Sequence, residues 1–179
     1  LISVFVLVFT PQADITLSKD MQGERTRIYS IDYYVNDLQG RYFETVLRAT
    51  AQKTILSLIF YINSTGNKIN NLDSAFSEVM LTGNLNSVPI DSLTGKSIML
   101  NSTLQDWSTR IVNTAKETLN VNTTIAISNV SVHQTKPWSI EASMSVDFTV
   151  KSDVAEWKKS TIIVSSVSIE GMHDPYYLI

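Results

Sequence analysis

The segment WSIEASMSVDFTVK, residues 138–151, alternates apolar and polar side chains without a miss. Successive side chains of a β-strand point to opposite faces, so this period of two predicts a strand with one buried and one solvated face. One-sided strands of this kind are typical of antiparallel sheets. We therefore expect Trp138, Ile140, Met144 and Phe148 to form part of the core.

Two further strands are expected around this one. Apolar residues alternate over 125–132 with a change of phase near Asn129, which indicates a β-bulge. The pair Lys136-Pro137 marks a turn, and a third strand is predicted over about 160–170. Together they form a three-stranded antiparallel meander. Its apolar face needs a cover, which helices over 41–62 and 102–119 can supply.

The chain before residue 120 has a helical period instead. Apolar residues recur every three or four positions from Ile28 to Ala49, and the run over 55–62 is apolar nearly all round. This predicts either one long helical arm or a helix broken near Gly40, with Gly66 as the stop. Two alternatives account for the apolar face of this helix. It packs into the core, or it remains an exposed stripe through which copies of the chain associate.

Further helices are predicted after the arm. One spans Asp73 to Leu81 with Asp73 as its cap, and a capping box with Ser102 as N-cap and Gln105 at N3 starts another over 102–119. Residues 84–100 are expected to be an irregular connection. The fold class is therefore α+β, with an N-terminal apolar segment and helical arm over 1–62 and a globular part over 63–179.

The chain begins with a nearly continuous apolar run. As a helix it would measure about 14 Å, roughly half the hydrocarbon core of a bilayer. Three interpretations stand: part of a longer apolar helix, a buried β-strand, or the apolar region of a signal peptide. We expect an assembly or anchoring element made of Leu1, Ile2, Val4, Phe5, Val6, Leu7, Val8 and Phe9.

The composition excludes several kinds of chemistry. The 179 residues contain no cysteine and two histidines, and 14 basic against 17 acidic residues give a net charge of −3. Thiolate chemistry is therefore excluded, and a broad nucleic-acid footprint is not expected. Gly95-Lys96-Ser97 lacks the earlier glycine of a phosphate-binding loop, because position 90 is Ile. We expect no enzymatic activity, no cofactor and no metal site.

Four asparagines stand in glycosylation sequons. About as many are expected by chance in a chain this rich in Asn, Ser and Thr, so the pattern alone is weak. The apolar N-terminus suggests an extracellular location and so strengthens the interpretation of these sequons as glycosylation sites. The candidate glycosylation sites are Asn63, Asn101, Asn122 and Asn129.

The order of these segments resembles archaeal type IV pilin-like surface proteins. The stretch from Arg25-Thr26-Arg27-Ile28 to Asp37-Leu38 looks like their anchor-proximal helix. The ending Ser168-Ile169-Glu170-Gly171, followed by Asp174-Pro175, is similar as well. The resemblance implies an N-glycosylated protein at the cell surface or outside the cell of an archaeon, with copies of itself as partners.

Two functions follow from this reading. The first is a structural subunit of an extracellular filament or pilus, a homo-oligomer assembled through its apolar N-terminal helix. The second is a membrane-anchored extracytoplasmic binding or sensor module, in which the N-terminal segment only tethers the chain to the membrane.

Overall fold

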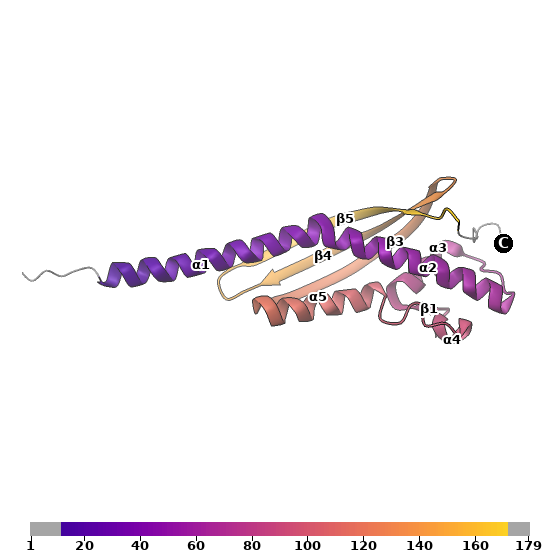
Figure 1. The fold of residues 1–179 in the computed structure, drawn as a ribbon, viewed down its shortest axis with the longest axis horizontal. Helices are drawn as coiled ribbons and strands as arrows, with labels where there is room; N and C mark the ends of the chain where they lie inside the picture. Colours follow the sequence, from indigo (N-terminus) through magenta and orange to yellow (C-terminus); the bar gives the residue numbers. More distant parts are fainter. Residues whose placement is uncertain (1–11, 172–179) are drawn as a thin grey trace, which may run out of the picture.

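The computed structural model describes the backbone of residues 12–171 and the side chains of residues 22–171 apart from Thr135. A long N-terminal helix lies along a three-stranded antiparallel sheet, and three further helices complete the fold (Figure 1). The predicted α+β class, with helices before about residue 120 and antiparallel strands after it, is confirmed. The apolar segment 1–9 lies outside the described residues.

The long helix runs without interruption from Gln12 to Thr65. It consists of α1 (Gln12–Asp37), a π-helical turn η1 (Leu38–Tyr42) that contains Gly40, and α2 (Phe43–Thr65). The extra residue of a π turn rotates the helix that follows it relative to the helix before it. Gly66 ends the helix in the left-handed conformation, at φ 68°, as the sequence predicted.

Two of the shorter helices have N-cap residues other than the predicted ones. Helix α3 (Leu72–Thr82) is capped by Asn71, whose side chain accepts a hydrogen bond from the Ser74 backbone N–H at 3.0 Å. Helix α5 (Leu104–Leu119) is capped by Thr103, which forms its capping box with Asp106. The predictions of Asp73, and of Ser102 with Gln105, were therefore wrong by one or two positions, because neighbouring residues have the same capping chemistry.

The connection over 84–100 is more ordered than predicted. Strands β1 (Asn84–Leu85) and β2 (Val88–Pro89) form a hairpin, and the short helix α4 (Ile90–Thr94) follows directly. The two turn residues, Asn86 and Ser87, both have positive φ. Glu78 holds this turn, since its carboxylate accepts hydrogen bonds from both backbone N–H groups at 3.0 and 2.7 Å.

The large sheet is a meander in the order β3-β4-β5. Its strands are β3 (Asn122–Lys136), β4 (Ser139–Lys151) and β5 (Glu156–Ser168). The predicted bulge is present, because the register of β3 against β4 shifts between Ser128 and Ser131, and Asn129 has a φ of 50°. Pairing of β4 with β5 continues without a shift over the whole length of β5.

Helices cover one face of this sheet. Helix α2 packs on β5 and β4, while α5 and α3 pack on β3 (Figure 1). The alternation of β4 is confirmed from Ile140 to Val150, where every even-numbered residue is buried. At the centre of this layer Phe43 of α2 meets Phe148 edge-on, with ring centroids 5.4 Å apart.

Trp138 does not belong to the core as predicted. It lies with Pro137 in the turn between β3 and β4 and is 65% exposed. The apolar alternation continued by chance one step beyond the start of the strand, where the chain already turns.

The core contact of Phe148 predicts a large loss of stability on truncation. Replacing Phe148 by Ala should lower the free energy of unfolding by about 3–5 kcal/mol, because it leaves a cavity against Phe43. The exposed Trp138 is the matched control, and Trp138→Ala should change it by less than about 0.5 kcal/mol. Chemical denaturation of both variants tests this. Equal losses in the two variants would contradict the placement of these side chains.

Candidate functional site

The start of α1 stands apart from the body of the molecule. Each described side chain from Gln22 to Thr26 is exposed, and the first buried one is Ile31. Arg27 marks the edge of the body, where its guanidinium pairs with the Asp153 carboxylate at 2.8 Å. From Gln12 to Arg27 the helix extends about 22 Å at 1.5 Å per residue. We call residues 12–26 the stalk (Figure 1).

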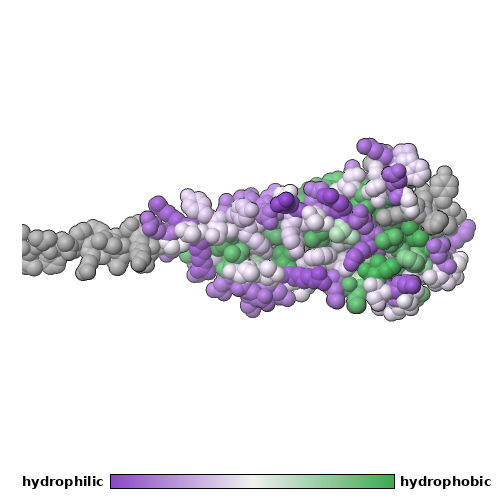
Figure 2. All heavy atoms as spheres, in the orientation of Figure 1, coloured by the Kyte–Doolittle hydropathy of each residue, from purple (hydrophilic) through white to green (hydrophobic). Residues whose placement is uncertain are grey.

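The stalk is polar where its side chains are described. Hydrophilic residues occupy the region where α1 leaves the body (Figure 2). None of the helices within residues 12–171 combines the length and the apolar character that crossing a membrane requires. The eight residues predicted as an assembly or anchoring element, Leu1 to Phe9 without Ser3, lie outside the described part of the chain.

An apolar groove lies where α1 passes the end of α5. It has a volume of about 630 Å³ and lies between residues of α1 and the pair Thr118 and Leu119. Tyr29 and Tyr33, one helical turn apart on α1, line it and are 72% and 75% exposed. Two adjacent tyrosines with this exposure offer a large amphipathic contact surface. The sequence analysis did not single out Tyr29, although its spacing of four from Tyr33 was the available signal.

Tyr34, the neighbour of Tyr33, points into the body. Its hydroxyl and that of Thr123, at the start of β3, are both buried, and neither makes a well-formed hydrogen bond. Burial raises the pKa of Tyr34 to about 12, and the nearby Thr123 hydroxyl offsets part of that rise. A buried hydroxyl without a well-formed hydrogen bond costs free energy, so Tyr34 is buried here at some expense in stability.

A basic hollow borders the same end of the body. It has a volume of about 470 Å³ and is lined by Arg27, Lys116 and Lys151, with Asp153 as its carboxylate. Asn122, one of the sequon asparagines, also lines it. Three cations and one carboxylate line it, so this hollow carries more positive than negative charge although the whole chain carries a net charge of −3.

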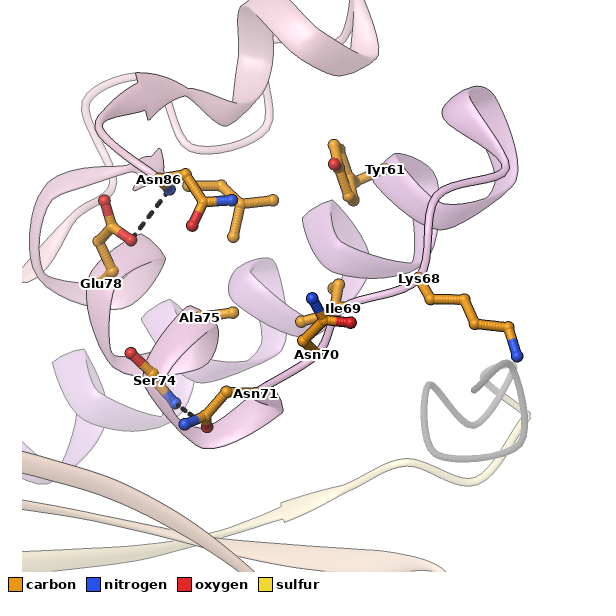
Figure 3. Close-up of a pocket in the computed structure, with 10 residues that line it drawn as sticks. Tyr61, Lys68, Ile69, Asn70, Asn71, Ser74, Ala75, Glu78 and Asn86 are labelled. Carbon is orange, nitrogen blue, oxygen red and sulfur yellow. Dashed lines mark hydrogen bonds between the residues drawn. The ribbon is translucent and has the colours of Figure 1, made fainter.

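A small polar pocket lies at the opposite end of the body, between α2, the loop after it, α3 and β1 (Figure 3). Its volume is about 170 Å³. Two of its polar side chains already serve the fold: Asn71 caps α3, and Glu78 holds the β1–β2 turn. These two groups are therefore committed to local structure.

Within residues 12–171, no group of three or more His, Asp or Glu side chains is placed to hold a metal ion. At Gly95-Lys96-Ser97, the next two backbone N–H groups, of Ile98 and Met99, donate to the Asp91 carboxylate at 3.0 Å each. These two N–H groups therefore already have an acceptor within the chain.

The four sequon asparagines are all exposed but differ in their surroundings. Asn63 lies in the last turn of α2. In the sequon of Asn101, Thr103 is buried and its hydroxyl is engaged in the capping box of α5. Asn129 occupies the bulge of β3, and its side chain donates to the Ser145 hydroxyl at 3.4 Å.

Comparison with known proteins adds no relative. No protein family, no characterised protein and no solved structure matched this chain.

The buried Tyr34 hydroxyl predicts a loss of stability in alkali. Its folded pKa of about 12 lies above the ordinary value of 10.0, so folding favours the protonated form. The stabilisation is complete below about pH 10 and is lost as the pH rises through about 12. Tyr34→Phe cannot ionise, so its free energy of unfolding should fall less between pH 9 and 12 than that of the unaltered chain. Parallel curves for the two proteins would contradict the burial of this hydroxyl.

Proposed function

We propose that this chain is a structural subunit of an extracellular filament of the type IV pilin-like kind, assembled through its apolar N-terminal helix. Its partners are copies of itself, and its place is the cell surface of an archaeon. The N-terminal segment contacts the membrane before assembly. The role requires no cofactor and no catalytic residue.

The stalk is the observation that carries this proposal. One uninterrupted helix runs from Gln12 to Thr65 and packs on the sheet through its second half. Its first part extends beyond the body, and the side chains described there, from Gln22 to Thr26, are exposed (Figure 1). In the sequence, the apolar run at residues 1–9 precedes this helix. A rigid helix of this kind transmits a load from an apolar anchor to a folded body. The exposed Tyr29 and Tyr33 provide contact area for neighbouring copies beside the stalk.

Burial of the apolar run supplies the driving force for assembly. Each of its large side chains contributes about 1.5–3 kcal/mol when it leaves water. Eight such residues supply on the order of 12–24 kcal/mol before the entropy of association is subtracted. The apolar run can leave water by contact with neighbouring copies of the chain or by contact with lipid.

The position of Asn63 agrees with an exposed outer surface. It lies at the end of α2, which is the far end of the long helix from the stalk (Figure 1). Along the helix it is about 54 Å from Arg27 at 1.5 Å per residue. A glycan at this position points away from a filament core formed by the stalks.

The alternative is a membrane-anchored binding or sensor module. The polar pocket in Figure 3 supports it, because this pocket lies at the end of the body remote from the stalk, where a tethered domain meets its ligand. In that case the N-terminal segment only holds the chain at the membrane.

Electron microscopy tests the filament directly. The full chain should form filaments, and a chain starting at Asp14 should stay folded and soluble without forming them, since the stalk side chains described before Arg27 are exposed. Leu100→Ser in the full chain is the control, because Leu100 is 64% exposed in the loop before α5, remote from the stalk, and filaments should persist. Filaments from the shortened chain, or only single anchored copies of the full chain, would exclude this assembly route.

Glycosylation should follow the accessibility of the sequons. Peptide mass spectrometry of the protein from its natural source should find a glycan on at least one sequon asparagine, with Asn63 the best placed. Asn101 should be bare in protein glycosylated after folding, because the capping box of α5 holds Thr103. Four bare asparagines would remove the support that the sequons give to an extracellular location.

A further inference from the structure

The pocket in Figure 3 combines buried apolar side chains with exposed polar ones. Its apolar part consists of Ile69, Ala75 and Leu85, all of which are buried. Its volume of about 170 Å³ corresponds to about six water molecules at about 30 Å³ each. That is roughly the space of a single sugar ring, and it is well below the roughly 300–1,000 Å³ of pockets for drug-sized ligands. The pocket therefore fits a small ligand that has both apolar and polar groups.

Three neutral polar groups surround this space and come from three different elements. Tyr61 belongs to α2, Asn70 to the loop before α3, and Asn86 to the β1–β2 turn (Figure 3). Among the residues that the structure describes, none forms a hydrogen bond with either amide group or with the tyrosine hydroxyl. An amide offers an acceptor oxygen and two N–H donors, and a hydroxyl both donates and accepts. This set matches the hydroxyls of a sugar, each of which also donates and accepts.

The backbone that presents these groups is held in place. Asn86 has a φ of 52°, and its backbone N–H donates to the Glu78 carboxylate at 3.0 Å. Asn70 stands between Ile69, whose side chain is buried, and Asn71, which caps α3. A ligand that meets polar groups on a fixed backbone loses less free energy to ordering of the chain. The pocket is therefore preorganised for binding.

The charges at the pocket disfavour ionic ligands. Of the described residues that line it, Glu78 is the one carboxylate and Lys68 the one cation. Both oxygens of Glu78 accept backbone N–H groups of the turn, and a single carboxylate supplies too few oxygens to hold a metal ion. The side chain of Lys68 points away from the other labelled residues, so it does not face an anion inside the pocket (Figure 3). A neutral ligand therefore fits better than a cation, an anion or a zwitterion.

We propose that this pocket binds one neutral pyranose ring, either as a free sugar or as the terminal unit of a glycan. The C–H groups of the ring contact the apolar part of the pocket. Its hydroxyls exchange hydrogen bonds with the amides of Asn70 and Asn86 and with the Tyr61 hydroxyl. The pocket lies at the end of the body remote from the stalk, so the proposal does not rest on assembly through the N-terminal segment.

Saturation-transfer NMR on the full chain tests the binding, and this method works for dissociated and assembled protein alike. The probes are the methyl glycosides of glucose, mannose, galactose and N-acetylglucosamine. At least one should bind with a dissociation constant on the order of millimolar, since so small a ligand gains little free energy in total. Immobilised glycans that end in the same sugars then distinguish the two sources. Retention of the chain on them identifies a glycan end, and binding of the methyl glycoside alone identifies a free sugar.

Two glycine variants then locate the site. Asn86→Gly removes one amide, and glycine also adopts positive φ, so the turn and its hydrogen bonds to Glu78 are kept. It should weaken binding about five- to tenfold. Asn120→Gly is the matched control, because Asn120 has a φ of 51° at the C-cap of α5, beside the stalk, and binding should be unchanged.

Tyr61→Phe keeps the ring and removes the hydroxyl, so it should weaken binding several-fold in folded protein. Three results overturn the proposal. They are no binding of any of the four methyl glycosides to the folded chain, equal affinities in Asn86→Gly and Asn120→Gly, and tighter binding of inorganic phosphate or glycine than of every glycoside.

Discussion

The structure depends on the burial of one apolar surface: helices must cover the inner face of the large sheet, with α2 packing on β5 and β4 and with α5 and α3 packing on β3. Phe43 and Phe148 meet at the centre of this contact, 5.4 Å between ring centroids. Because α2 is fixed there, the direction of α1 is fixed as well, since the π turn joins them without a break. The stalk is thus held by the same interaction that stabilises the core. Tyr34 and the Arg27–Asp153 pair are secondary contacts that secure the helix on its way out of the body.

The spacing of apolar residues predicted which segments form helices and strands. It was less accurate about the residues at which those elements begin and end. The strands, the bulge at Asn129 and the stops at Gly66 and Gly83 follow from local rules that this chain obeys. Caps were misplaced because Ser102 and Thr103 have the same chemistry, and only packing decides between them. The β1–β2 hairpin has strands of two residues, too short for a periodic signal, and Glu78 stabilises its turn from eight and nine positions away. The exposure of Ile162 and Trp138 also had no local signal, because it depends on which face and which turn the tertiary structure leaves open.

The candidate site is a surface rather than a cleft with reactive groups. The polar pocket between α2, α3 and β1 includes a helix cap and a turn anchor among its side chains, and Asp91 accepts the backbone N–H groups that follow Gly95-Lys96-Ser97. What the described chain offers outward is a stalk with two exposed tyrosines and a regular strand edge at β5. In the proposed filament, a heterologous contact along the stalks joins successive copies.

Amide hydrogen exchange, compared between assembled and dissociated protein, tests the central claim that the stalk is the part neighbouring copies cover. The amides of the stalk and of α1 up to Ser30 should exchange quickly in the dissociated chain relative to those of α2. They should gain protection on assembly, while those at the centre of β4 remain equally protected in both states. Unchanged protection in the stalk, with new protection confined to other surfaces of the body, would contradict the account.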